Sequence, residues 1–220
     1  LKLIHLSEAQ LLMHCLIWFL IAQMASAAEE ATTSGRPMES VWDYPRPAVL
    51  EMIDDEIVVV FNGVEVVRTT KGARVLETSH PPSYYVPLAD LNKAAGVSLV
   101  PSGGGGSFCE WKGRAHYYDL VVNGKRAPRA VWAYPNPSTR VNPKQAHGWS
   151  NFGSGTSTGT GGSFAPLKDM VAFYCASVDE CRVAGETSTP QAGAFYGGWV
   201  NSWIDGGERG IKGAAGTSHY

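Results

Sequence analysis

The chain of 220 residues carries 18 Lys and Arg against 20 Asp and Glu, a formal net charge of −2 at pH 7. Because no basic stripe accompanies this balance, nucleic acid is not expected as a partner. Seven Trp, nine Tyr and seven Phe favour a sheet with aromatic cross-strand pairs, suited to a pocket for a small molecule. Without residues 1–40 and 140–163, about 150 residues remain, which is enough for one hydrophobic core.

The first 40 residues differ in kind from the rest. Residues 11–22 form an apolar run that is shorter than a membrane-spanning helix requires. Lys2 before it and Ala25-Ser26-Ala27 after it match the layout of a cleaved secretory signal. The chain does not begin with Met, so a fragmentary or mistranslated leader without a targeting role stays open as the alternative. No other membrane segment is expected.

The cysteines and histidines bear on compartment and cofactors. Cys15 lies in the leader, which leaves Cys109, Cys175 and Cys181, and an odd number argues against a disulfide framework. Pairing of Cys175 with Cys181 across a turn stays open. A reduced, cytoplasmic environment is favoured, with secretion as the alternative if the leader is a signal. His116, His147 and His219 show no ligand spacing, and neither a metal nor another cofactor is expected.

Two segments predict β-hairpins. Residues 57–67 and 118–125 both contain an Asn-Gly pair between strand-like runs, at Asn62-Gly63 and Asn123-Gly124. Asn-Gly is the strongest short hairpin signal because both turn residues need a positive φ. The two segments therefore predict a domain built from related hairpins in tandem.

A second repeat supports the same prediction. Residues 41–47 (Val-Trp-Asp-Tyr-Pro-Arg-Pro) return as residues 131–137 (Val-Trp-Ala-Tyr-Pro-Asn-Pro), with five of seven positions identical. Each proline fixes φ and biases the preceding residue toward an extended conformation. We expect one local geometry in both copies, a short strand with large rings on alternate sites, and a scaffolding role for the repeat.

The remaining segments complete a mainly β fold. We expect a corner at Pro81-Pro82, a short helix within 87–95, a flexible glycine loop at 101–107 and one helical turn at 165–170. The prediction is a single β-rich domain over residues 41–204, either a barrel or a two-sheet sandwich with one or two short helices. It is expected to have a disordered leader at 1–40, a low-complexity insertion at 140–163 and a flexible tail at 205–220.

Five motifs in a fixed order carry a family resemblance. They are residues 42–47 (Trp-Asp-Tyr-Pro-Arg-Pro), 76–82 (Leu-Glu-Thr-Ser-His-Pro-Pro), 109–115 (Cys-Glu-Trp-Lys-Gly-Arg-Ala), 132–137 (Trp-Ala-Tyr-Pro-Asn-Pro) and 195–199 (Phe-Tyr-Gly-Gly-Trp). Over residues 38–213 the chain resembles the microbial domain of unknown function 427. The resemblance implies a small, mostly β fold in which the Glu-Thr-Ser-His-Pro-Pro segment faces the Cys-x-x-Lys-Gly segment.

The family is sometimes filed under a nucleotidyltransferase-like label. That chemistry usually places a Gly-Ser pair ahead of an Asp-x-Asp pair that binds metal. The chain has no such arrangement, and its Asp54-Asp55 pair is adjacent and beside a hairpin. The residues therefore give the label little support.

Glu77 and His80 are the first candidates for chemistry. They lie three residues apart on the corner held by two prolines, and a rigid loop is a common place for a site. A carboxylate beside an imidazole can orient it and raise its basicity for acid–base catalysis. The alternative is structural: Glu77 caps backbone amides of the loop while His80 packs under Tyr84.

Cys109, Glu110 and Lys112 form the second candidate cluster. A lysine beside a thiol favours the thiolate, which is the nucleophilic form of cysteine. The alternatives are a Cys109 that is merely buried and a Lys112 that contacts an anionic or carbonyl group of a ligand.

Aromatic residues are candidates for ligand contacts. Five tyrosines can either line a pocket with hydroxyl groups or pack in the core, namely Tyr84, Tyr85, Tyr117, Tyr118 and Tyr134. The glycines at 197 and 198 allow a close approach of the backbone, and the following Trp199 can either cover a ligand or close the barrel. We expect Tyr85, Glu110, Tyr118 and Trp199 to contact a substrate.

Two hypotheses of function follow. In the first, the protein binds or transforms a small polar metabolite where the Glu77–His80 corner meets the Cys109–Lys112 strand. In the second, the same residues form a hydrogen-bond network in a non-catalytic module. A site requires His80 and Lys112 to converge on an open cavity. The substrate, the presence of catalysis and the oligomeric state do not follow from the sequence.

Overall fold

The computed structural model describes residues 35–139, 163–193 and 195–217. The predicted secretory signal and the low-complexity tract fall almost wholly outside these residues. Strands dominate, and the helices within the described residues are short 3₁₀ turns, so the mainly β prediction is confirmed. No helix in the described part of the chain has the length and apolar character needed to cross a membrane.

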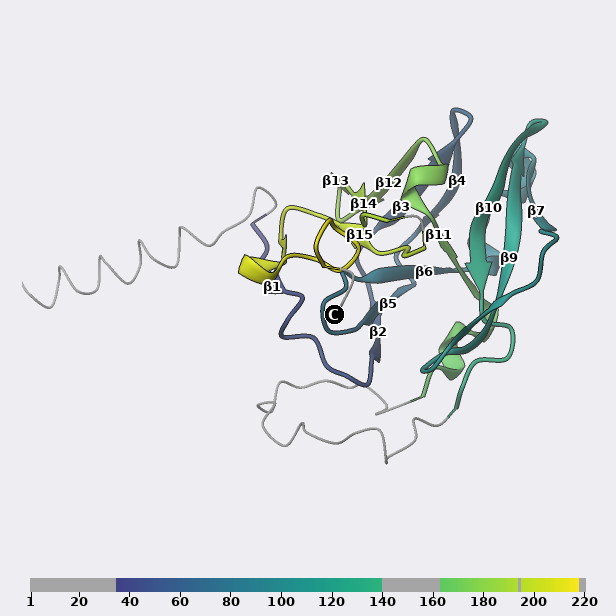
Figure 1. Ribbon diagram of the computed structural model, residues 1–220. Coiled ribbons are helices and arrows are strands. Elements are labelled where there is room, and N and C mark those ends of the chain that lie inside the picture. The colour runs from purple at the N-terminus through teal and green to yellow at the C-terminus, as the bar shows by residue number, and fades with distance from the viewer. Residues whose placement is uncertain (1–34, 140–162, 194, 218–220) are drawn as a thin grey trace, which may run out of the picture.

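The largest sheet has eight strands that pair antiparallel (Figure 1). In spatial order they are β2 (Val49–Ile53), β5 (Gly72–Leu76), β6 (Ser83–Pro87), β11 (Met170–Phe173), β10 (Lys125–Ala133), β9 (Gly113–Val122) and β7 (Val97–Pro101), with β8 (Ser107–Cys109) pairing β9. The path ends at β2 and β7, so this sheet is open. Because the strands are pleated, alternate residues of each strand lie on opposite faces of the sheet.

Three smaller sheets complete the fold. A four-stranded sheet has the order β13 (Glu186–Thr187), β12 (Glu180–Val183), β3 (Ile57–Phe61) and β4 (Val64–Thr69). Two pairs join distant segments: β1 (Glu39–Ser40) with β16 (Ile204–Asp205), and β14 (Thr189–Pro190) with β15 (Trp199–Val200). The 3₁₀ helices are η1 (Leu88–Asp90), η2 (Lys93–Ala95), η4 (Ala165–Asp169), η5 (Cys175–Ser177) and η6 (Gly207–Arg209). The short helix expected within 87–95 is thus two separate turns.

Both Asn-Gly hairpins are confirmed. Asn62 and Gly63 have φ values of 53° and 70° between β3 and β4, and Asn123 and Gly124 have 48° and 81° between β9 and β10. Two consecutive residues with positive φ match the right-handed twist of the flanking strands. The relation between the two hairpins as tandem repeats stays a prediction.

The expectation of one geometry for the Val-Trp-x-Tyr repeat is wrong. Val131 and Trp132 lie in β10, whereas residues 41–44 form a turn after β1. The indole of Trp42 donates to the carbonyl oxygens of Gly206 and Gly210, at 2.9 and 3.1 Å. Contacts with the C-terminal segment therefore determine the conformation of the first copy, and local sequence does not.

That C-terminal segment is also more than a tail. The Lys212 amide donates to the Ser79 carbonyl oxygen at 2.9 Å, and β16 pairs with β1. Within residues 205–217, Lys212 thus contacts the corner between β5 and β6, and the flexibility expected of this segment stays a prediction. The side chains between the two larger sheets form one apolar core, in which Cys181 is buried. Cys175 and Cys181 are free thiols in this structure, and the two thiols interact with each other.

Candidate functional site

A cavity of about 410 Å³ lies where β6, β8, β9 and β10 meet the corner after β5. Three segments line it with residues two apart, namely Val75 and Glu77, Ser83 and Tyr85, and Trp132 and Tyr134. A spacing of two is the period of a strand, so each of these three segments turns one face toward the cavity. Residues 107–112 all line it. The cavity thus lies over one face of the large sheet.

The Glu77–His80 corner forms one wall of the cavity. The His80 amide donates to the Glu77 carbonyl oxygen at 3.0 Å, and Ser79 has a φ of 70°, so this corner is a tight turn. The Glu77 carboxylate accepts a hydrogen bond of 3.0 Å from the indole of Trp111. Arg46 approaches the same carboxylate at 3.7 Å. Glu77 is therefore held by side chains and does not cap the backbone amides of the loop.

His80 bonds to Gln191 and not to Glu77. The Gln191 amide nitrogen lies 3.1 Å from His80 Nδ1 and 2.8 Å from the Lys212 carbonyl oxygen, while the Gly198 amide donates to Gln191 Oε1. These contacts orient the amide, so its nitrogen donates to Nδ1 and the proton of a neutral His80 lies on Nε2. The ring packs edge-on against Tyr196 with centroids 4.8 Å apart, and not under Tyr84.

Burial sets the protonation state of His80. It lowers the pKa of the imidazole to about 4, with smaller contributions from Lys212 and Lys112, against the opposing effects of Glu77 and Gln191. This direction is opposite to the raised basicity expected from the Glu77–His80 spacing. At neutral pH, His80 therefore presents an N–H donor and carries no positive charge.

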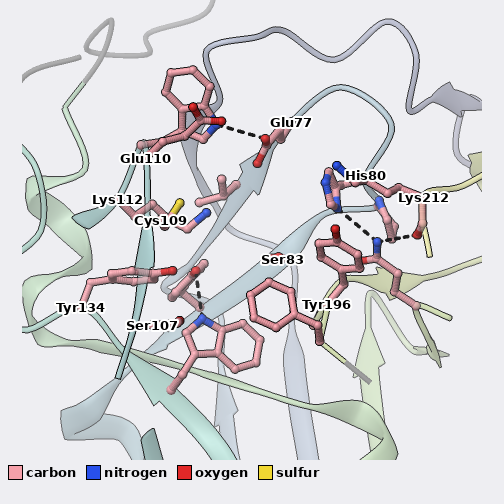
Figure 2. A pocket seen from close by; sticks show the side chains of 18 of the residues that line it. Glu77, His80, Ser83, Ser107, Cys109, Glu110, Lys112, Tyr134, Tyr196 and Lys212 are labelled. Atoms are coloured by element: carbon pink, nitrogen blue, oxygen red, sulfur yellow. Dashed lines mark hydrogen bonds between the residues drawn. The ribbon is translucent and has the colours of Figure 1, made fainter. Parts of the chain in front are cut away.

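Lys112 lies on the opposite wall. The turn at residues 110–112 joins β8 to β9, and it is followed by Gly113, which has a φ of 96°. Lys112 is the last residue of this turn and lines the cavity. Figure 2 shows its ammonium group beside the Cys109 sulfur and directed toward the space between the walls. The ammonium nitrogen lies 5.7 Å from the centre of the Tyr134 ring.

The environment of Lys112 acts on its pKa in both directions. Burial acts to lower the pKa of the ammonium group, whereas the ionised forms of Tyr85 and Cys109 together with Glu77 act to raise it, and the net direction is upward. Burial also raises the pKa of the Tyr85 and Tyr134 hydroxyls, which stay neutral. The inner wall therefore offers one cation and two phenol groups to a ligand.

Some of the predicted site residues line the cavity, and others do not. Glu77, His80, Tyr85, Cys109, Glu110 and Lys112 all line the cavity. Tyr118 and Trp199 do not. Strand alternation turns Tyr117 toward the cavity and Tyr118 toward the core, and the buried Trp199 donates to the Phe173 carbonyl oxygen. Their expected substrate contacts are therefore corrected.

Several lining residues were not singled out in the sequence. Trp132 and Arg46 come from the Val-Trp-x-Tyr-Pro-x-Pro repeat, which the sequence predicts to be scaffold, and the same repeat supplies Tyr134, one of the five candidate tyrosines. Gln191 and Lys212 belong to glycine-rich C-terminal segments, in which no local sequence pattern indicates a functional site. The sequence did indicate the close approach at residues 197 and 198. A Cβ on Gly198 would lie 2.6 Å from both Gln191 Oε1 and Pro81 Cγ.

A second cavity of about 480 Å³ adjoins the first. Both are lined by a shared group of residues, namely Ser107, Tyr117, Tyr174, Gln191, Phe195, Tyr196 and Gly197. The second cavity also reaches the glycines at 104–106 and Arg129. Arg129 stacks 4.1 Å from the centre of the Tyr117 ring and donates to the Gly103 carbonyl oxygen.

Among the described residues, no group of three or more His, Cys, Asp or Glu side chains is placed to bind a metal ion. The chain matches no curated protein. One family model matches, over residues 49–152. This segment contains Glu77, His80, Cys109 and Lys112, whereas Gln191, Tyr196 and Lys212 lie beyond it. The matching model describes a domain of unknown function, DUF427, and residues 49–152 are similar to it.

Proposed function

We propose that the protein binds a small polar metabolite in the 410 Å³ cavity. The observation that carries this proposal is the position of His80 and Lys112 on opposite walls of one cavity, as Figure 2 illustrates. A concave site with a few convergent polar groups among aromatic side chains is the usual form of a small-molecule site. The volume falls within the range of such sites, about 300 to 1,000 Å³.

Each polar group has a distinct role in this proposal. His80 donates from Nε2 to an oxygen of the ligand, because Gln191 occupies Nδ1. Lys112 supplies the charge at the inner wall. Cys109 and Glu77 lie within the same cavity and are the groups available for covalent or acid–base chemistry, should the ligand be transformed.

A structural module without a ligand is the second candidate function. It is favoured by the hydrogen bonds that Glu77 and His80 make to Trp111 and Gln191, since these bonds join distant parts of the chain. Under this alternative, a variant at His80 changes stability but no binding.

A binding screen of the full chain against a metabolite library separates the two functions. The expected result is a ligand whose affinity falls by about tenfold or more in His80→Ala, because a hydrogen bond to the ligand is lost. His116→Ala is the matched control, since His116 is exposed on β9 and lies outside the cavity. The proposal fails if every ligand found binds His80→Ala as it binds the native chain.

A further inference from the structure

Lys112 is the strongest indication of what the cavity binds. Only 8% of the residue is exposed, and it is cationic at neutral pH. Within the described residues it forms no ion pair, because the two carboxylates of the cavity, Glu77 and Glu110, both pair with Arg46. Its neighbours there are the Cys109 thiol and the Tyr134 ring, and a buried charge without an opposite charge in direct contact is costly.

The other donors point in the same direction. His80 adds an N–H donor at Nε2, which has no hydrogen-bond partner among the described residues. Lys212 adds a second cation on that wall, with its ammonium nitrogen 5.6 Å from the centre of the Tyr196 ring. Donors on both walls, with Glu77 already bonded to Trp111, suit a ligand that accepts hydrogen bonds and carries negative charge.

The rim of the cavity has a different chemistry. Phe108 and Phe195 are the two most exposed large apolar side chains in the described part of the chain, at 74% and 65%. Both line this cavity, from β8 and from the segment before β15. Because both residues are exposed and line the cavity, we describe Phe108 and Phe195 as its aromatic entrance, in contrast to the polar side chains of the interior. Exposed aromatic groups beside a pocket are typical of a binding surface.

We propose that the ligand is an organic anion whose carboxylate or phosphate group binds Lys112 and whose apolar body contacts Phe108 and Phe195. This inference rests on the proposed function and adds the class of ligand to it. Lys112 supplies the charge, His80 the directional hydrogen bond, and the aromatic entrance the preference for an apolar body.

The inference is tested by thermal shift and calorimetry on the full chain at constant ionic strength. The probes are benzoate, phenyl phosphate, acetate, inorganic phosphate and the neutral benzamide. We expect the aromatic anions to raise the Tm, acetate and inorganic phosphate to bind more weakly, and benzamide to have no effect. The comparison of benzoate with phenyl phosphate distinguishes a carboxylate ligand from a phosphate ligand.

Substitution of the lysine supplies the second readout. In Lys112→Met the affinity for the aromatic anion should fall by at least about tenfold, since the charge that binds it is gone. The Tm of the unliganded variant is measured in parallel, so that a loss of binding is separated from a loss of folding. Lys168→Met is the matched control at an exposed lysine outside the cavity, and Lys112→Gln serves if methionine impairs folding.

Two outcomes overturn the inference. In the first, benzamide binds as well as benzoate, or Lys112→Met binds benzoate with unchanged affinity. In the second, no anionic probe binds while the metabolite screen yields a neutral ligand that depends on His80, and the proposed function then stands. If the screen also yields no ligand that depends on His80, the proposed function fails as well.

Discussion

Lys112 and Asp119 are buried charges at and within strand β9, and they differ in their partners. Lys112 immediately precedes β9 and forms no ion pair within the described residues. Asp119 lies within β9, and its carboxylate accepts hydrogen bonds from Ser102, from Arg126 at 2.7 Å and from the Arg129 amide at 2.8 Å. These bonds, first of all that from Ser102, lower the pKa of Asp119. Removing one partner from a buried, hydrogen-bonded charge is destabilising, whereas a buried charge without an ion-pair partner is available to an oppositely charged ligand.

The largest expected effect follows from the Asp119 side of this comparison. Asp119→Ala leaves the Arg129 amide and the Ser102 hydroxyl without their acceptor, and should lower the free energy of unfolding by about 3 kcal/mol. Denaturant unfolding of the native chain and the variant measures the loss.

The control for this experiment is Asp169→Ala, at an exposed aspartate that ends η4. Its free energy of unfolding should change by no more than about 0.5 kcal/mol. A similar loss in both variants would mean that the Asp119 network stabilises nothing beyond an ordinary surface contact.

The local signals in the sequence were sufficient for part of this fold. Asn62-Gly63 and Asn123-Gly124 predicted their hairpins because the turn itself demands positive φ. The sequence could not predict which side of a strand faces the cavity. A period of two places Tyr117 and Tyr118 on opposite faces, but it does not indicate which of them faces the cavity.

The other residues that the sequence did not predict are brought to the site by contacts between distant parts of the chain. Gln191 orients His80 and Lys212 completes the wall, yet both come from segments more than 100 residues away in the chain. The spacing of Glu77 and His80 indicated a hydrogen-bonded pair, and the structure gives each residue a different partner. Their presence in one cavity was predictable, but their protonation state depended on burial by these distant segments.

The second prediction concerns how stability depends on the protonation of His80, the uncharged hydrogen-bond donor of the cavity. Its folded pKa, about 4, lies below the ordinary value of 6.5, so the native state binds the proton less readily than the unfolded chain does. Stability from this group is complete above pH 6.5 and is lost as the pH falls toward 4. We expect a loss of about 2 kcal/mol over this window, less than the full pKa shift would give because the ring is partly exposed.

The measurement compares unfolding free energies at pH 7 and pH 4.5 for the native chain and for His80→Gln. The variant should lose less stability on acidification, while His116→Gln, at an exposed histidine, should follow the native chain. Equal pH dependence in all three proteins would show that burial of His80 has no energetic consequence.

The smallest effect concerns two arginines of similar exposure. The Arg46 side chain is 47% exposed and pairs at 2.8 Å with Glu110, itself half exposed, whereas Arg126 is 52% exposed and bonds to the largely buried Asp119. Arg46→Gln should cost about 0.5 kcal/mol, since exposed ion pairs contribute little. Arg126→Gln should cost about 1.5 kcal/mol, because a buried carboxylate loses a charge-assisted bond. Denaturant unfolding at low and high salt measures both. Equal costs would show that burial of the partner does not decide the contribution, and the contrast between Asp119 and Lys112 would then lose its physical basis.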